Sequence, residues 1–380
     1  MKARRATRVV VATAAGLAVA APAIARAHGA AGLSEATAWA HWPITPEIAV
    51  PTALVVVLYL TGMARRPSPV DAVARWRHGA FLAGIAALFL ALQSPLDPVA
   101  ERLFFVHQIQ HLLLRLIGPM LIALAAPQGV LIAGLPVPIR RTLLAPVAGS
   151  AVVRAVFAAI TGPVVVTGLF VGALYVWELP RFHQAALADP LIHQIMHASM
   201  VFAGVVFWWR IFDRRPAPQG LRYGVRPMML WLVTLSNIVL GALTTFKTTV
   251  LYPAYDLPGR LFGYAALADE RIGGIIIWIP GSMMCVLAVL LVIHVWGRRE
   301  TRLEQRQPER SRAVSGAAVI AAQAPRNRAL ALGFAAFAVT VFAVTILLGM
   351  LSQLSGPAVT EIAPTGPRHA AHLEESVRLR

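Results

Sequence analysis

The strongest constraint on this chain is a series of long apolar runs spaced along most of its length. The runs lie at about residues 46–64, 79–93, 103–125, 155–178, 190–209, 227–247, 272–296 and 329–351. Each is near the roughly 20 residues that an α-helix needs to cross a bilayer. Only 13% of the 380 residues are charged and 58% are hydrophobic, whereas a soluble domain has roughly 25% charged residues. The sequence therefore predicts an all-α, polytopic membrane helix bundle.

The N-terminal segment has the parts of a secretory signal peptide. Basic residues between Lys2 and Arg8 precede an apolar run, and Ala25-Arg26-Ala27 fits the small-x-small cleavage rule. The alternative is an uncleaved first anchor, because the apolar run is long enough to stay partly in the membrane. With cleavage, seven core transmembrane helices remain, followed by an eighth at the C-terminal side. The predicted organisation is a signal peptide at 1–27, a seven-helix membrane domain at 28–297, a cytoplasmic linker at 298–328, an additional transmembrane helix at 329–351 and a periplasmic tail at 352–380.

The basic residues set the predicted orientation. The net charge of +17 comes from 34 Lys+Arg against 17 Asp+Glu, and most arginines lie in alternate loops between the apolar runs. The other loops, 94–102, 179–189 and 248–270, hold one arginine each. Cytoplasmic loops carry this excess, so we expect a bacterial inner-membrane protein with both termini in the periplasm. Because membrane orientation already accounts for these basic loops, the high positive charge does not indicate a nucleic-acid partner. The single cysteine, Cys285, excludes a disulfide framework.

One short pattern, His-Gln-Ile-x-His, occurs near the start of the third and of the fifth predicted span. It reads His107 to His111 in the first copy and His193 to His197 in the second. Residues four apart lie on one helix face, so each copy points two imidazoles in one direction. Both spans run from outside to inside, which places the four histidines at matched depth near the outer surface. We therefore expect the four imidazoles to converge.

Histidines at this depth are candidates for a metal site. Ionisable residues inside a membrane are functional by default, and imidazole is a good ligand for copper, zinc and iron, with nearby thioethers favouring Cu(I). Met196 lies within the second copy of the pattern, His183 lies in an outside loop from which it would deliver metal, and His28 would become the N-terminus after cleavage. All three are further candidate ligands. The structural alternative is that the histidines only hydrogen-bond across the helix bundle.

Other polar residues near these spans have structural interpretations. Asp97 and Asp189 each precede a proline just before a histidine-bearing span, where a carboxylate favours a helix start. Arg115 lies one turn beyond His111 inside the third span. A charge there requires a carboxylate, a carbonyl or water, so the sequence predicts a buried polar partner for it.

Several of these motifs together resemble the CtaG family of multi-pass cytochrome c oxidase assembly proteins, which differs from the single-span copper chaperone of the same name. The matching pieces are Ser94-Pro95-Leu96-Asp97, His107 to Leu114, Gly118-Pro119, Ala126-Pro127, Asp189 to His197, Phe207-Trp208-Trp209 and Trp278-Ile279-Pro280-Gly281. The resemblance implies seven core helices and a role in maturing a haem–copper oxidase by supplying or inserting copper on the outer side. It carries over His107, His111, His193 and His197 as site residues. The eighth span and Arg115 depart from the family pattern.

The leading functional hypothesis is a non-enzymatic assembly factor. The four histidines would bind copper transiently, receive it from a periplasmic copper donor and pass it to cytochrome c oxidase subunits through weak, partly exposed coordination. The alternative is a haem-binding electron-transfer protein, since histidines on facing helices can ligate haem axially. A copper transporter is a third hypothesis, opposed by Arg115 and Lys247. The chain contains no zinc-protease helix, serine elbow or phosphate loop.

Overall fold

The computed structural model describes residues 33–65, 72–215 and 219–305, and these are folded entirely from helices without a strand. The predicted signal peptide with His28, the predicted eighth helix and the predicted tail lie outside the described residues. The all-α architecture expected from the apolar runs is confirmed.

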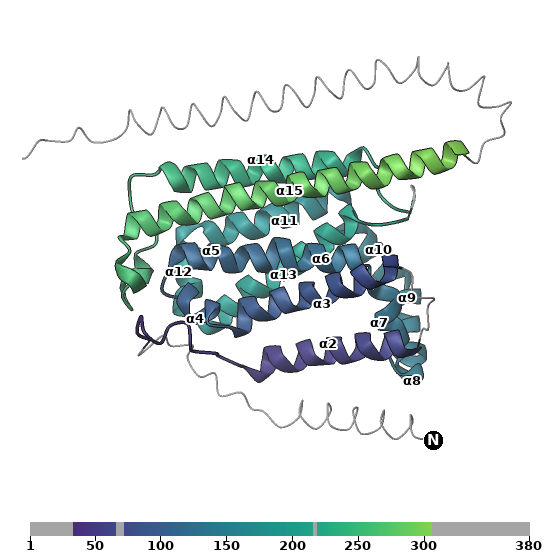
Figure 1. Ribbon diagram of the computed structural model, residues 1–380, viewed down its shortest axis with the longest axis horizontal. Coiled ribbons are helices and arrows are strands. Elements are labelled where there is room, and N and C mark those ends of the chain that lie inside the picture. Colours follow the sequence, from purple (N-terminus) through teal and green to yellow (C-terminus); the bar gives the residue numbers. More distant parts are fainter. Residues whose placement is uncertain (1–32, 66–71, 216–218, 306–380) are drawn as a thin grey trace, which may run out of the picture.

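Most of the long helices run roughly side by side in one bundle (Figure 1). They are α2 (Pro46–Arg65), α3 (Ala72–Gln93), the run of α5 (Phe104–Leu112), η1 (Leu113–Ile117) and α6 (Gly118–Ala125), α11 (Pro163–Glu178), α13 (Pro190–Ile211), α14 (Val225–Phe246) and α15 (Ala266–Gln305). In the described part, five helices are long and apolar enough to cross a membrane, or up to seven if each of two bent pairs is one span. The chain is a multi-pass membrane protein.

The predicted span at 155–178 is broken in the structure. Helix α10 (Ala151–Ile160) ends before Thr161 and Gly162, and α11 begins at Pro163. Proline lacks the amide hydrogen that would continue the preceding turn and its ring clashes with that turn, so the apolar run divides into two helices here. The expectation of one continuous helix was wrong at this point. At its other end, α11 is followed by α12 (Pro180–Ala188), and the two helices are bent by 73°.

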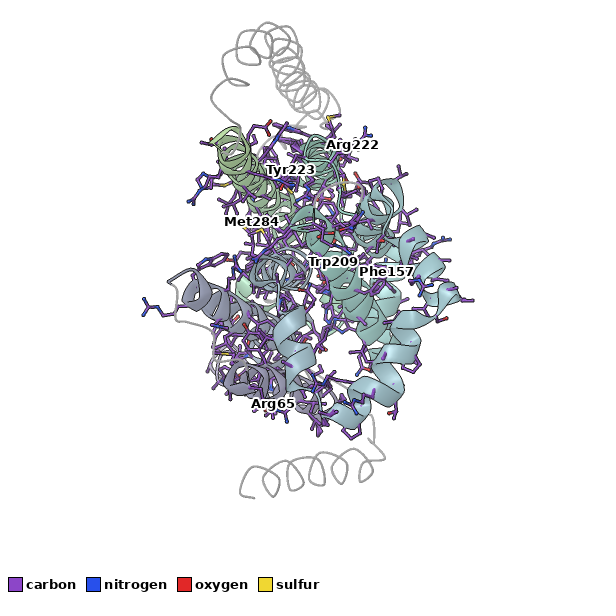
Figure 2. The ribbon with its side chains drawn as sticks, turned by 90° about the vertical axis from the view of Figure 1, so that its right-hand side faces the viewer. Arg65, Phe157, Trp209, Arg222, Tyr223 and Met284 are labelled. Carbon is purple, nitrogen blue, oxygen red and sulfur yellow. The ribbon has the colours of Figure 1, made fainter. Side chains whose placement is uncertain are left out.

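Short helices and basic side chains gather at one end of the bundle. Helices α7 (Gln128–Gly134), α8 (Val137–Ile139), η2 (Arg140–Leu144), α9 (Ala145–Gly149) and α10 lie there (Figure 1). Figure 2 views this end along the helices, with Arg65, Trp209, Arg222 and Tyr223 labelled. The Arg65 guanidinium donates to the backbone oxygens of residues 133–135 at 2.9–3.1 Å. Helix α15 also ends on this side, and its last turns extend into the predicted linker.

The opposite end of the bundle is closed by α4 (Leu96–Ala100), α12 and the segment 247–265, which contains η3 (Pro253–Asp256) and η4 (Leu261–Gly263). We call 247–265 the cap segment. Its buried ion pairs, Lys247 with Glu270 and Arg260 with Asp269, hold it to the start of α15. The Asp269 carboxylate also accepts hydrogen bonds at 2.9–3.0 Å from the first two backbone amides of α5. The cap segment and the first histidine-bearing helix are therefore both fixed to the carboxylate of Asp269.

Candidate metal centre

The four histidines of the two His-Gln-Ile-x-His copies converge, as the sequence predicted. The rings of His107 and His111 on α5 are 4.4 Å apart between centroids, as are those of His193 and His197 on α13. Between the helices, the His107 ring is 5.4 Å from that of His193 and 5.9 Å from that of His197. The structure thus agrees with the expected geometry, and metal binding itself stays a prediction.

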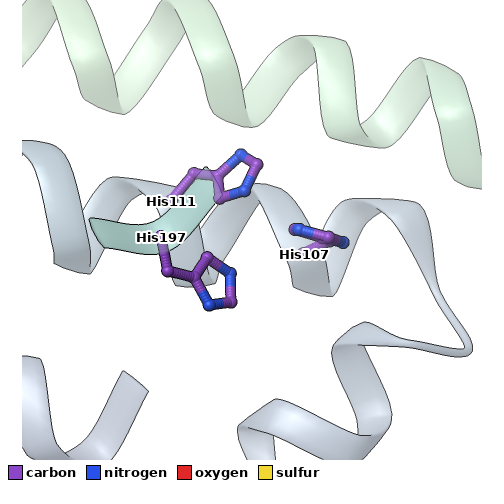
Figure 3. A group of neighbouring side chains, drawn as sticks. All are labelled: His107, His111 and His197. Carbon is purple, nitrogen blue, oxygen red and sulfur yellow. The ribbon is translucent and has the colours of Figure 1, made fainter. Parts of the chain in front are cut away.

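Three of the four imidazoles form the tightest group. His107, His111 and His197, which we call the histidine trio, each offer one nitrogen, and these nitrogens all lie within 4.8 Å of one another (Figure 3). His193 falls outside this group. Its Nδ1 lies 3.9 Å from Oε1 of Glu101. The quartet predicted from the sequence therefore consists of a trio and one histidine with a carboxylate beside it.

The site is more deeply buried than expected. The exposed fraction of each of the four histidines is between 0% for His107 and 7% for His193 and His197. The expectation of partly exposed imidazoles was wrong. The physical reason is that α12 and the cap segment pack over the first turns of the histidine-bearing helices, bringing His183 and Tyr255 against His107.

A chain of hydrogen bonds fixes the orientation of His107. His183 Nδ1 lies 3.0 Å from the Trp177 carbonyl oxygen, His183 Nε2 lies 2.8 Å from the Tyr255 hydroxyl, and this hydroxyl lies 2.8 Å from His107 Nδ1. Because a carbonyl only accepts, His183 Nδ1 carries the hydrogen, and a neutral ring then accepts from Tyr255 at Nε2.

The hydroxyl oxygen of Tyr255 consequently accepts from Nδ1 of His107. Burial raises the pKa of Tyr255 well above its usual value, so the hydroxyl keeps its proton. His107 Nε2 is then left with a lone pair, and this buried atom makes no hydrogen bond within the described residues. Metal-binding histidines usually have their other nitrogen held in this way. The arrangement presents Nε2 of His107 as a ready ligand atom.

Sequence reasoning missed Glu178, at the end of α11. Its Oε1 is 3.8 Å from His111 Nδ1, longer than a hydrogen bond, and the side chain is almost fully buried. The Tyr252 hydroxyl donates to the Glu178 backbone oxygen at 2.7 Å and lies 3.2 Å from its Oε2. The signal in the sequence was a single carboxylate at the end of an apolar run, where a charge is costly.

Comparison with known proteins gives the family of this chain. The family model described as cytochrome c oxidase caa3 assembly factor (Caa3_CtaG) matches residues 57–299. The chain belongs to this family. The resemblance inferred from the motifs is thereby confirmed.

Three mycobacterial proteins are similar to this caa3 assembly factor family member. Uncharacterized proteins of Mycobacterium bovis and Mycobacterium tuberculosis are each 25% identical over 70% of this chain and 41% of their own length. One of Mycobacterium leprae is 25% identical over 67% of the chain and 40% of its own length. The chain thus spans about two-fifths of the length of these relatives. No solved structure matches it significantly.

The other candidate ligands of this family member lie in different surroundings. Met196 is fully buried in an apolar cluster with Leu174, Ala186, Met200 and Ile277. His183, expected in a solvated loop, is instead fully buried on α12. Both of its ring nitrogens are hydrogen-bonded, one of them to Tyr255, and its ring packs against that of His107 at 5.0 Å between centroids.

The two aspartates have different roles. Asp189 caps α13, accepting from the backbone amides of Leu191 at 2.8 Å and Ile192 at 3.2 Å, so its predicted role is confirmed. Asp97 lies in the first turn of the short helix α4 rather than at the start of the histidine-bearing helix α5, and its Oδ1 accepts from Gln110 Nε2 at 2.6 Å. Asp97 therefore orients the side chain of Gln110, which lies between His107 and His111 in the sequence.

Arg115 has the buried polar partners that the sequence required. Its Nη2 donates to Asn237 Oδ1 at 3.1 Å and its Nε to the Phe170 backbone oxygen at 3.3 Å. The guanidinium carbon lies 4.1 Å from the centre of the Phe170 ring. Arg115 lies in the π-helical turn η1, and π turns inside α-helices frequently accompany functional sites.

Proposed function

We propose that this cytochrome c oxidase assembly factor binds copper transiently at the histidine trio and passes it to an oxidase subunit. The observation that carries the proposal is the approach of three buried imidazole nitrogens to within 4.8 Å of one another. Copper is cargo in this scheme. The family relationship supports the oxidase as client, and the trio supplies the chemistry for holding the ion.

The donor set suits copper. Three imidazoles without a thiolate or carboxylate in the same group leave a coordination position open. Neutral imidazole is a good copper ligand. The open position differs from structural zinc sites, which are closed by four ligands, although catalytic zinc sites share the three-imidazole set. An open position allows an incoming ligand of the client to bind copper before the trio releases it. This supports transfer rather than storage.

The arrangement favours an ion over haem, the alternative cofactor. A haem held by two axial histidines needs room for a flat macrocycle between them. Here the third imidazole of the trio lies against the other two, with ring centroids 4.4–5.9 Å apart. A small cation needs no such space.

The proposal includes the orientation of the protein. The basic residues Arg65 and Arg222 lie at the end of the bundle opposite α4 and α12 (Figures 1 and 2). By the positive-inside rule this basic end faces the cytoplasm, so the histidine trio lies toward the periplasm of a bacterial inner membrane. Both termini would be periplasmic, and a periplasmic donor would supply the copper. The role is non-enzymatic.

The test compares the purified wild type with a His107→Ala/His111→Ala/His197→Ala variant. We expect about one copper per wild-type chain after loading with Cu(I), none in the variant, and loss of oxidase copper in cells that carry the variant. His294→Ala is the matched control, because this histidine lies exposed on α15 far along the chain from the trio. Equal copper in wild type and triple variant would contradict the proposal. A Soret band without copper would favour haem.

A further inference from the structure

His193 differs from the other histidines in its surroundings. It lies outside the histidine trio, and Oε1 of Glu101 is 3.9 Å from its Nδ1. Glu101 is the residue at which α4 ends, in the turn that leads to α5. Its carboxylate places a negative charge at one side of the four imidazoles.

Glu101 is also more accessible than the four imidazoles beside it. The exposed fraction of the Glu101 side chain is 14%, whereas His193 and His197 are each 7% exposed and His107 is completely buried. Helix α4 lies at the end of the bundle that the cap segment closes (Figure 1). Glu101 therefore offers an approaching ion a carboxylate at the more accessible edge of the cluster.

The distances allow stepwise transfer from the pair to the trio. The His193 ring is 4.4 Å from the His197 ring and 5.4 Å from the His107 ring. An ion held at His193 can bind either neighbour by a small movement. In this step the bond from copper to the His193 nitrogen breaks as bonds to the nitrogens of His197 and His107 form. No electron is transferred, and the carboxylate of Glu101 stays behind.

We propose that Glu101 and His193 form a separate copper-capturing site through which the ion enters and leaves the histidine trio. The inference rests on the proposed copper binding by the trio and divides the quartet into a binding part and a transfer part. The carboxylate attracts the cation, and carboxylates near a binding site raise the association rate of cations. Because the ion passes the pair in both directions, the pair sets rates and leaves the equilibrium affinity almost unchanged.

The experiment measures Cu(I) loading of the full-length protein in detergent from a chromogenic Cu(I) chelator. We expect Glu101→Gln to slow loading and release each about tenfold, because the ion passes this carboxylate in both directions and a nearby charge changes the rate of cation capture. Stoichiometry stays at one, and Glu101→Asp, which keeps the charge, restores most of the rate. His193→Gln behaves like Glu101→Gln, whereas His111→Ala loses affinity. Glu47→Gln is the matched control, because it removes an exposed carboxylate at the start of α2.

Two results would overturn the inference while leaving the proposed function intact. One is loading of Glu101→Gln at the wild-type rate. The other is loss of equilibrium affinity in His193→Gln as large as that in His111→Ala, which would make His193 an ordinary ligand. Failure of the wild type to bind any Cu(I) would instead overturn the proposed function, and this inference with it.

Discussion

Tyr255 offers a quantitative test of how the site is organised. Its hydroxyl lies 2.8 Å from His107 Nδ1 and 2.8 Å from His183 Nε2. Tyr255→Phe removes this oxygen and leaves two buried ring nitrogens without their partner. His107 is then free to change tautomer and place its hydrogen on Nε2, the nitrogen that carries the lone pair in the wild type.

The expected effect is on copper affinity. Loss of a group that orients a metal-binding histidine typically costs 10–100-fold in affinity, which corresponds to about 1.4–2.7 kcal/mol. Each buried hydrogen bond that is lost also costs stability, about 1–3 kcal/mol where a polar atom is left unpaired. Competition with a Cu(I) chelator measures the first effect, and thermal unfolding in detergent measures the second.

The control and the refuting result follow from the same contacts. Tyr264→Phe removes a hydroxyl from the same cap segment. The Tyr264 ring packs in a tilted arrangement against Phe105, 5.2 Å between centroids, and we expect wild-type affinity for this variant. His183→Ala removes the next member of the chain and is expected to resemble Tyr255→Phe. Wild-type Cu(I) affinity in Tyr255→Phe, in a protein that is correctly folded, would refute the orientation argument.

Two further predictions concern residues around the trio. Glu178→Gln removes the carboxylate 3.8 Å from His111 Nδ1 and is expected to lower Cu(I) affinity about tenfold; chelator competition with unchanged affinity would exclude a role for this charge. Asp189→Ala removes the cap of α13 and is expected to lower stability by about 1 kcal/mol; an unchanged unfolding temperature would show that packing alone fixes the start of this helix.

Features encoded locally in the sequence were predicted well. Apolar run length gave the helices, the four-residue spacing placed His107 beside His111 and His193 beside His197, and the Asp-Pro step at Asp189 gave a helix start. The break at Gly162 and Pro163 was also local and was overlooked.

What the sequence did not reveal depends on contacts between distant segments. Tyr255 lies 148 residues from His107, and Asp269 lies 165 residues from the amide of Phe104 that it caps. Neither pair follows a helical or strand period in the sequence that would predict its contact. Nor does a motif show that Glu101 lies beside His193 rather than in solvent. The division of the four histidines into a trio and a carboxylate-bearing pair therefore emerged only from the fold.

The most direct test of the central claim is X-ray absorption spectroscopy of the Cu(I)-loaded protein, read for the kind and number of ligand atoms. We expect the copper to have three imidazole nitrogens as its nearest neighbours, at about 2.0 Å, and no sulfur. The His107→Ala/His111→Ala/His197→Ala variant should give no bound-copper spectrum. A sulfur neighbour at about 2.3 Å would place the copper at a methionine or at Cys285, and would contradict the assignment to the histidine trio.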